Sequence, residues 1–289
     1  MDLGLDRIAR RLAGPTVRRL RRERQWYACR RQLDLTVLDE PGARRAGLDH
    51  TVITHATPVV RRLAGVDLGL QRTKAVNLRL AVAHLDGVVL APGQRLSFWH
   101  RVGPPSARRG YLEGVVLDDG RLTAGIGGGL CQLTNLLYWM TLHTPLTVVE
   151  RWRHTYDVFP DVGRTQPFGT GATCAYPALD LQLENRTTQP FRLSVGVQGR
   201  GDEQQLVGAW FTDQPPRQRY EIYESAHLMT HDGPGVFRRH NSVRRRVIGP
   251  DGAQLDDEPV AENHALLRYQ PFLPAAAPRP EAPGGRPPG

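Results

Sequence analysis

Three consecutive glycines, Gly127–Gly129, stand just before Cys131 and constrain the fold of the chain more than any other feature. Glycine loses more conformational freedom on folding than any other residue, so a run of glycines indicates a sharp bend or a close approach of the backbone to another group. The apolar residues that follow recur at helical spacing, and Pro145 disfavours a helical conformation at the residue before it. The sequence therefore predicts a tight turn and a helix that begins at Cys131 and ends near His143.

The segments around this helix alternate apolar and polar residues and are separated by Gly, Pro and Asp residues typical of turns. Strand–turn–strand units are predicted over residues 87–99, 113–126, 178–197 and 244–260, the last three as hairpins, and a single strand over 146–159. A second helix is predicted over residues 73–85, with Val76, Leu80 and Ala83 on its apolar side. Runs of hairpins around one or two helices are typical of an α+β fold with a mainly antiparallel sheet.

Composition divides the chain of 289 residues into four regions. Residues 1–31 are rich in arginine and predict a basic N-terminal arm, and residues 32–214 hold the main domain. Alternating patterns over residues 215–273 predict a C-terminal β-hairpin extension. The tail of residues 274–289 is rich in Pro, Gly and Ala, and we expect it to be disordered because it cannot bury a core.

The N-terminal arm holds much of the formal net charge of +9. Leu5, Ile8 and Leu12 lie at helical spacing among arginines, which predicts a short basic amphipathic helix that ends at Gly14–Pro15. Such an arm is either simply solvated or in contact with an anionic membrane surface through residues 1–31. A nucleic-acid partner is not expected, because no helix-turn-helix, zinc finger or aromatic RNA-binding platform accompanies the charge.

The cysteines indicate the compartment. Cys29, Cys131 and Cys174 are far apart and odd in number, which argues against a disulfide framework and favours a reducing environment. The sequence shows neither a secretory signal nor an apolar run of about 20 residues. We therefore expect a cytoplasmic protein, with peripheral membrane association as a further expectation.

Cys131 is the candidate nucleophile. A helix N-terminus lowers the pKa of a thiol, because unsatisfied N–H groups and the helix dipole favour negative charge there. The predicted helix places Thr134, Asn135 and Tyr138 on the same, more polar face as Cys131. The candidate base is His154, on the predicted strand that follows the helix.

Other interpretations stay open at this point. Free cysteine is often a small buried apolar residue, so Cys131 can be part of the core. Cys131, His154 and Cys174 could together bind zinc, but no paired ligand spacing supports a metal site, and no cofactor is expected. A Cys131–Cys174 redox pair lacks a supporting pattern in the same way. His100 and His143 have no neighbouring constellation and are interpreted as structural or exposed.

The residues of this region resemble a known family. The stretch "GGGLCQLTNLLYWMTLHTPLTVVERWRHTYDVFP", which begins at Gly127, closely resembles the core of the VanW family. The resemblance extends upstream through "NLRLAVAHLDGVVLAPGQRLSFWHRVG" and downstream through "GATCAYPALDLQLENRT". The family's signature residues correspond to Gly127, Gly128, Gly129, Cys131, Gln132, Glu150, Arg151 and His154. One departure is Gly171, where many relatives have an aspartate in a Gly-x-Asp-Ala-Thr stretch.

The resemblance implies a bacterial cell-wall or glycopeptide-resistance context, with a peptidoglycan precursor or a glycopeptide-like ligand as partner. For an enzyme, the residues themselves favour acyl transfer or amide hydrolysis with Cys131 as nucleophile and His154 as general base. Gln132 and the amides of Gly127–Gly129 would then stabilise an oxyanion. The residues expected to contact substrate are Gly127, Gly128, Gly129, Asn135, Glu150 and Arg151, with Arg151 facing an acidic group. The competing hypothesis is a non-catalytic binding module in which Cys131 is structural and the glycine loop holds an anion or peptide.

Overall fold

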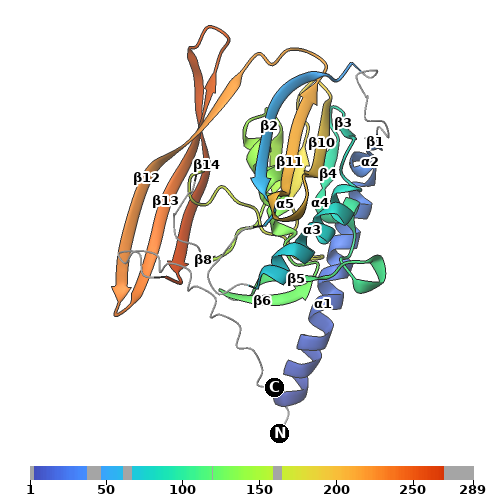
Figure 1. The fold of residues 1–289 in the computed structure, drawn as a ribbon, viewed down its shortest axis with the longest axis vertical. Coiled ribbons are helices and arrows are strands. Elements are labelled where there is room, and N and C mark those ends of the chain that lie inside the picture. Colours follow the sequence, from blue (N-terminus) through green and yellow to red (C-terminus); the bar gives the residue numbers. More distant parts are fainter. Residues whose placement is uncertain (1–2, 38–46, 61–66, 119, 159–164, 270–289) are drawn as a thin grey trace, which may run out of the picture.

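The computed structural model describes residues 3–37, 47–60, 67–118, 120–158 and 165–269, with backbone alone for residues 3–15 (Figure 1). The helices are α1 (Leu3–Ala28), α2 (Arg30–Leu33), α3 (Leu68–Val82), α4 (Phe98–Val102) and α5 (Cys131–Leu142). The strands of the first half are β1 (Thr36–Val37), β2 (His50–Pro58), β3 (Val88–Leu90), β4 (Arg95–Ser97), β5 (Glu113–Asp118), β6 (Arg121–Ile126) and β7 (Thr147–Glu150). Those of the second half are β8 (Tyr156–Asp157), β9 (Gln182–Glu184), β10 (Phe191–Gln198), β11 (Gln205–Thr212), β12 (Arg219–Gly233), β13 (Val236–Ile248) and β14 (Gln254–Leu267).

These strands form four sheets. Their orders are β1-β3-β10-β11-β2, β4-β9-β7, β5-β6 and β12-β13-β14-β8. Neighbouring strands are antiparallel throughout, except that β8 runs parallel to β14. The prediction of an α+β fold with mainly antiparallel sheet is therefore confirmed.

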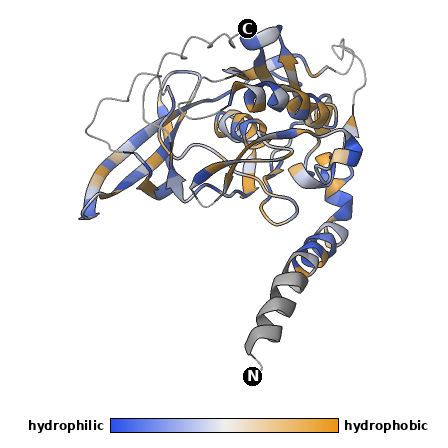
Figure 2. Cartoon of the chain, turned by 60° about the horizontal axis from the view of Figure 1, so that its bottom comes forward, coloured by the Kyte–Doolittle hydropathy of each residue, from blue (hydrophilic) through white to orange (hydrophobic). Residues whose placement is uncertain are grey.

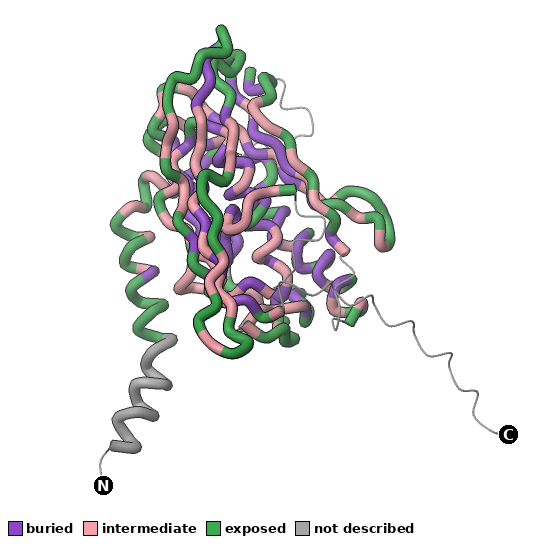
Figure 3. The backbone as a smooth tube through the Cα atoms, turned by 90° about the vertical axis from the view of Figure 1, so that its left-hand side faces the viewer, coloured by how far each residue is buried: buried purple, intermediate pink, exposed green. Residues whose placement is uncertain are grey.

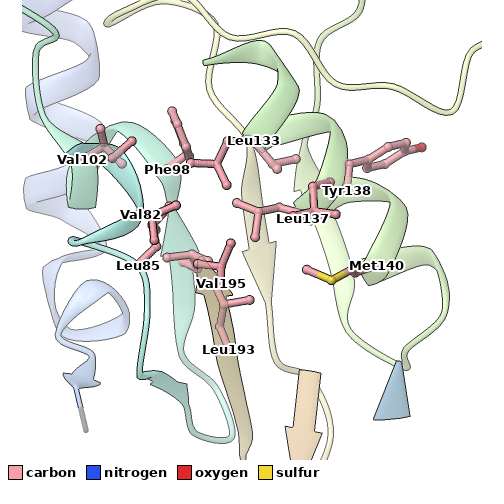
Figure 4. Packing of buried hydrophobic residues seen from close by; sticks show 14 of the residues in the cluster. Val82, Leu85, Phe98, Val102, Leu133, Leu137, Tyr138, Met140, Leu193 and Val195 are labelled. Atoms are coloured by element: carbon pink, nitrogen blue, oxygen red, sulfur yellow. The ribbon is translucent and has the colours of Figure 1, made fainter. Parts of the chain in front are cut away.

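The main core lies between the five-stranded sheet and the helices α3 and α5. Leu133 and Leu137 of α5 are completely buried and point toward Val195 on β10 (Figure 4). The helix approaches the sheet closely at Gly208 of β11, where an added Cβ would lie 2.7 Å from the Cε of Met140. Burial of each such leucine stabilises the fold by about 1.5–3 kcal/mol relative to exposure. This packing holds the first turn of α5, and with it Cys131, in a defined place.

The C-terminal sheet stands to one side of this core (Figure 1). Its strands β12, β13 and β14 have 15, 13 and 14 residues and form an antiparallel meander. Buried segments concentrate in the middle of the molecule, whereas much of β12 is exposed (Figure 3). The predicted hairpin over 244–260 is confirmed as the β13–β14 connection. The boundary predicted near residue 215 falls between β11 and β12, and the division into domains stays a prediction.

Helix α1 differs from the predicted arm. It projects from the body of the molecule and runs without interruption from Leu3 to Ala28, so the break predicted at Gly14–Pro15 is wrong (Figure 2). A proline removes one hydrogen bond and clashes within the preceding turn, which kinks or weakens a helix without always ending it. The C-terminal half is also not a simply solvated arm, because Arg22 is buried and the indole of Trp26 donates to the hydroxyl of Ser97. The side chains at positions 5, 8 and 12 lie outside the described residues.

Other local predictions have mixed outcomes. The hairpin over 113–126 is confirmed as β5–β6, and helix α5 ends at Leu142 as expected. The hairpin predicted over 178–197 is wrong, because β9 and β10 belong to different sheets. The single strand predicted over 146–159 is wrong as well, since β7 and β8 are separate strands of two sheets. Alternation identified these strands, but their partners come from distant parts of the chain.

The second helix is confirmed as α3, but its buried face is not the predicted one. Val76 and Ala83 are exposed and Leu80 is half-buried. The buried residues are Gln71, Lys74, Ala75, Asn77, Leu78, Ala81 and Val82. Apolar periodicity missed this face because three of its members are polar.

Two further predictions concern the C-terminal tail and the membrane. The tail of residues 274–289 lies outside the described residues. Within the described part of the chain, none of the helices is both long and apolar enough to cross a membrane.

Candidate functional site

Close packing on three sides requires glycine at each of the three positions in the turn before α5. A Cβ on Gly128 would lie 2.1 Å from the carbonyl carbon of Gly114, and one on Gly129 would lie 2.1 Å from the Cγ of Lys74. At Gly127, an added Cβ would lie 2.6 Å from the Cβ of Pro105. Gly127 and Gly129 also have φ angles of 76° and 93°, which favour glycine. Only glycine fits at these three positions.

The hydrogen bonds of the turn show which of its amides are occupied. The N–H of Gly127 donates to the carbonyl of Leu112, and the N–H of Gly128 donates to that of Gly125. By contrast, the N–H groups of Gly129, Leu130 and Cys131 donate to no acceptor among the described residues. The unpaired amides at this helix start are therefore those of the last glycine and of the two residues after it, and not those of Gly127 and Gly128.

The half-buried thiol of Cys131 lies at the centre of a small polar cluster. Its Sγ is 3.3 Å from the Oγ1 of Thr173 and 4.0 Å from the Sγ of Cys174. The Sγ of Cys131 also lies 3.7 Å from the carbonyl oxygen of Cys174. Of the other catalytic candidates, His154 affects this thiol by lowering its pKa.

Two side chains of α5 fix the segment that carries Thr173 and Cys174. The hydroxyl of Thr134 donates to the carbonyl of Ala172 at 2.6 Å, and the Oδ1 of Asn135 accepts from its N–H at 2.6 Å. The helix face that holds Cys131 was predicted to be the more polar one. Thr134 on this face is buried and Asn135 is exposed, and both bind the second segment, so this face mainly serves to dock that segment onto the helix.

The surroundings of Cys131 favour its thiolate. A hydrogen bond from Cys174 has the largest effect and, together with His154 and Thr173, holds the pKa of Cys131 well below its ordinary value, although burial opposes this. The pKa of Cys174 is raised well above its ordinary value, first by burial and then by the hydrogen bond and charge of Cys131. The two thiols are therefore unequal, with Cys131 the one that ionises first.

His154 reaches the cluster from an irregular segment. It lies between β7 and β8, and not on a regular strand as predicted. A single antiparallel bridge pairs Trp152 with Thr173, whose N–H donates to the Trp152 carbonyl at 2.8 Å. This bridge brings the segment of His154 alongside the segment of Cys174.

The surroundings of Glu150 differ from those expected of a residue that contacts substrate. Its carboxylate oxygens accept two hydrogen bonds from the guanidinium of Arg22, at 2.6 and 2.7 Å. The indole of Trp152 and the amide of Gln182 donate to the same carboxylate. Burial raises the pKa of Glu150, but hydrogen bonds from Arg22 and Trp152 and the charge of Arg22 outweigh it and hold the pKa below its ordinary value. These contacts favour a positioning role for Glu150.

Arg151 is likewise engaged by the protein. Its guanidinium donates to the carbonyls of Gly169 and Gly171 and lies 4.8 Å from the ring centroid of Tyr138. Burial lowers its pKa. Arg151 therefore holds the loop that leads into Thr173.

Gln132 and Asn135, the remaining candidates, point to neighbouring backbone. The side-chain NH2 of Gln132 donates to the Oγ1 of Thr57 and to the carbonyl of Pro58, at 2.9 and 2.8 Å, which places this group on β2 and not on an oxyanion. A Cβ on Gly171 would lie 2.8 Å from the Oδ1 of Asn135. The aspartate that many relatives have at this position would therefore require Asn135 to move.

Some residues of this region were missed by sequence reasoning. Thr173 and Arg22 carried no signal of their own, although Thr173 lies in the "GATC" stretch of the family resemblance. The histidines interpreted as structural have local partners, with the Nδ1 of His143 2.9 Å from the carbonyl of Trp139 and the ring of His100 5.4 Å from that of Trp26. Over the ranges described above, no group of three or more potential ligands is placed to hold a metal ion.

The fold and the site together define an α+β protein with a cluster of two thiols and a threonine hydroxyl at the start of a buried helix. A family model described as "VanW like protein" matches residues 73–207. The vancomycin B-type resistance protein VanW of Enterococcus faecalis (strain ATCC 700802 / V583) is 30% identical over 205 residues, which are 71% of this chain and 73% of that protein. The chain belongs to the VanW family.

A second relative matches a smaller part of the chain. The uncharacterized protein YoaR of Bacillus subtilis (strain 168) is 30% identical over 119 residues, 41% of this chain and 38% of that protein. No solved structure matches the chain.

Proposed function

We propose that this VanW-family protein uses Cys131 as a nucleophile in acyl transfer or amide hydrolysis on peptidoglycan-precursor-like substrates. The observation that supports it most strongly is the Cys131 thiol at the first residue of α5, in contact with Thr173 and Cys174 and with its pKa lowered in part by His154. The name of the Enterococcus relative refers to vancomycin B-type resistance, which is the support for a cell-wall context. A thiolate beside an imidazole is the usual arrangement for covalent catalysis by cysteine.

In the proposed reaction, the Cys131 thiolate attacks the carbonyl carbon of a substrate amide. The carbonyl oxygen becomes an oxyanion, for which the N–H groups of Gly129, Leu130 and Cys131 are the available donors. His154 holds the proton taken from the Cys131 thiol and gives it to the leaving amine as the C–N bond breaks, and water or an acceptor amine then releases the acyl group from the sulfur. Gln132, Gly127 and Gly128 shape the turn in this scheme, in place of the oxyanion role predicted for them.

A second candidate function is a non-catalytic binding module for cell-wall or glycopeptide ligands. The observation that favours it is that the side-chain amide of Gln132, predicted to stabilise an oxyanion, is engaged by Thr57 and Pro58. In such a module Cys131 would be a packed thiol, and a contact of residues 1–31 with anionic lipid would serve localisation at the membrane.

The experiment that separates the two is the pH dependence of iodoacetamide labelling at Cys131, followed by peptide mass spectrometry. We expect a midpoint well below the free-thiol value of about 8.5, because the thiolate is the reactive form. His154→Ala removes the contribution of the imidazole to the lowered pKa of Cys131, so the labelling midpoint should rise.

Cys29, between α1 and α2, provides an internal comparison in the same sample, and His143→Ala is the matched control variant, since His143 contacts Trp139 and not the thiol. Slow labelling of Cys131 that is insensitive to His154→Ala would contradict the enzyme and leave the binding module. If His143→Ala raised the labelling midpoint of Cys131 as much as His154→Ala does, the change would not be local to the thiol.

A further inference from the structure

The contact between Cys131 and Cys174 is not needed for the amide chemistry. The two Sγ atoms are 4.0 Å apart, although the residues are 43 positions apart in the sequence. The S–H of Cys174 points toward the sulfur of Cys131, and both side chains are half-buried. A disulfide has an S–S distance of about 2.05 Å, so the pair has to close by about 2 Å.

The structure keeps this pair together from both sides. Thr134 and Asn135, one turn after Cys131, bind the backbone of Ala172, two residues before Cys174. The N–H of Ala175 donates to the carbonyl of Leu179 on the other side of Cys174. Cys174 therefore lies on a short anchored segment facing the start of α5, where rotation of the two thiols can bring the sulfurs into contact.

We propose that Cys131 and Cys174 are a reversible redox pair, in which a hydroperoxide oxidises Cys131 and Cys174 resolves the product to a disulfide. In the first step the Cys131 thiolate attacks one oxygen of the hydroperoxide and the O–O bond breaks. The sulfur loses two electrons and becomes a sulfenic acid, and the peroxide is reduced to an alcohol, or to water for hydrogen peroxide, after taking up a proton. In the second step the Cys174 sulfur attacks the Cys131 sulfur, the S–O bond breaks, and the hydroxyl leaves as water with the Cys174 proton.

The unequal thiols suit these two roles. The attacking thiol is Cys131, whose pKa the hydrogen bond from Cys174 and the neighbouring His154 and Thr173 hold low. The resolving thiol is Cys174, which stays protonated until the sulfenic acid forms beside it, because burial raises its pKa. Disulfides inside reducing compartments are usually transient and serve redox sensing or catalysis. The disulfide would block Cys131, so it would switch off any reaction that uses this thiolate.

The redox pair needs an ionised Cys131, but it does not need Cys131 to attack amides. The test is therefore independent of a wall substrate. The full chain carrying Cys29→Ser is reduced, treated with stoichiometric hydrogen peroxide and alkylated, and the peptides of Cys131 and Cys174 are analysed by mass spectrometry. We expect a Cys131–Cys174 cross-linked peptide that disappears on addition of a dithiol reductant.

The matched variant is Cys174→Ser, which keeps a donor beside Cys131 but cannot form the disulfide. In this variant the Cys131 sulfenic acid should persist and react with dimedone about tenfold more than in the parent chain. Circular dichroism verifies that both proteins are folded, and Cys174→Ala provides a second variant should the serine disturb the site. Oxidation of Cys131 with Cys174 still open to alkylation would overturn the proposal, as would a Cys131 thiolate that peroxide leaves unchanged.

Discussion

Two arginine–carboxylate pairs illustrate how differently the core and the C-terminal sheet are built. Arg22 binds Glu150 across 128 residues of sequence, and the side chains of the two are 8% and 18% exposed. Arg244 binds Asp257 on the adjacent strand, 13 residues away, with exposed fractions of 35% and 28%. The first pair joins helix α1 to the strand before His154, and the second joins two strands that are already hydrogen-bonded to each other.

Some other polar contacts show the same contrast, although Arg245 and Asn241 of β13 also donate to the distant carbonyls of Thr144 and Phe168. Around Cys131, Asn77 donates to the carbonyl of Gly128, and Thr134 donates to that of Ala172, so side chains connect segments that are distant in sequence. In the C-terminal sheet, Arg245 and Glu258 pair across neighbouring strands. The geometry of the thiol cluster therefore depends on long-range contacts, and we expect it to be far more sensitive to substitution than the sheet.

The largest loss in the free energy of unfolding is expected for a substitution in the glycine turn. Gly128→Ala places a Cβ against the backbone of Gly114, which cannot rotate away as a side chain can. Relief requires that β5 and the turn separate, and we expect a loss of about 3 kcal/mol or more in the free energy of unfolding. Urea denaturation followed by circular dichroism measures it.

Gly196→Ala on β10 is the control for that substitution, because no heavy atom lies within 4 Å of the Cβ it adds. We expect it to change the free energy of unfolding by less than about 1 kcal/mol, since alanine also restricts the unfolded chain. Equal losses for Gly128→Ala and Gly196→Ala would show that the turn is not closely packed.

This turn shows where prediction from sequence succeeded. Three adjacent glycines indicate a close approach whatever the partner is, and the helix after them is defined by leucine spacing and Pro145. The β13–β14 hairpin was equally accessible, because Gly252 lies in the turn and both strands are continuous in sequence. Local chemistry determines all of these features.

The contacts that complete the site could not be predicted in the same way. Nothing in the residues around Arg22 indicates Glu150 as its partner, and alternation cannot show that β9 and β10 belong to different sheets. The strand expected to carry His154 is interrupted because β7 and β8 pair with different neighbours. These features follow from tertiary packing, which overrides local pattern.

The next largest effect is expected for the Arg22–Glu150 pair. Arg22→Ala leaves Glu150 partly buried without its main partner, for which we expect a loss of about 3 kcal/mol in the free energy of unfolding. Arg19→Ala is the matched control on the same helix, because the Arg19–Glu23 pair is exposed and should contribute no measurable stability. A comparable loss for the two variants would refute the long-range connection.

The pH dependence of this pair provides a second measurement. The folded pKa of Glu150 is lower than its unfolded value of about 4.3, so the stabilising contribution is fully present above that value. It is lost as the pH falls through the folded pKa, when the carboxylate becomes protonated. The difference in unfolding free energy between the parent chain and Arg22→Ala should therefore narrow in acid, whereas a constant difference would exclude the ion pair as its source.

The smallest effect is expected in the C-terminal sheet, at Arg244→Ala. Asp257 keeps its hydrogen bond from the hydroxyl of Tyr223 at 2.7 Å and can be solvated where the guanidinium was. Water and ions already screen this pair, and at about 1 M salt the Debye length falls to about 3 Å. We expect the urea midpoint to change little in low salt and not at all in high salt, while the loss for Arg22→Ala persists in both. A loss for Arg244→Ala as large as that for Arg22→Ala would mean that the sheet, despite its local pairing, depends on its arginines as strongly as the core does.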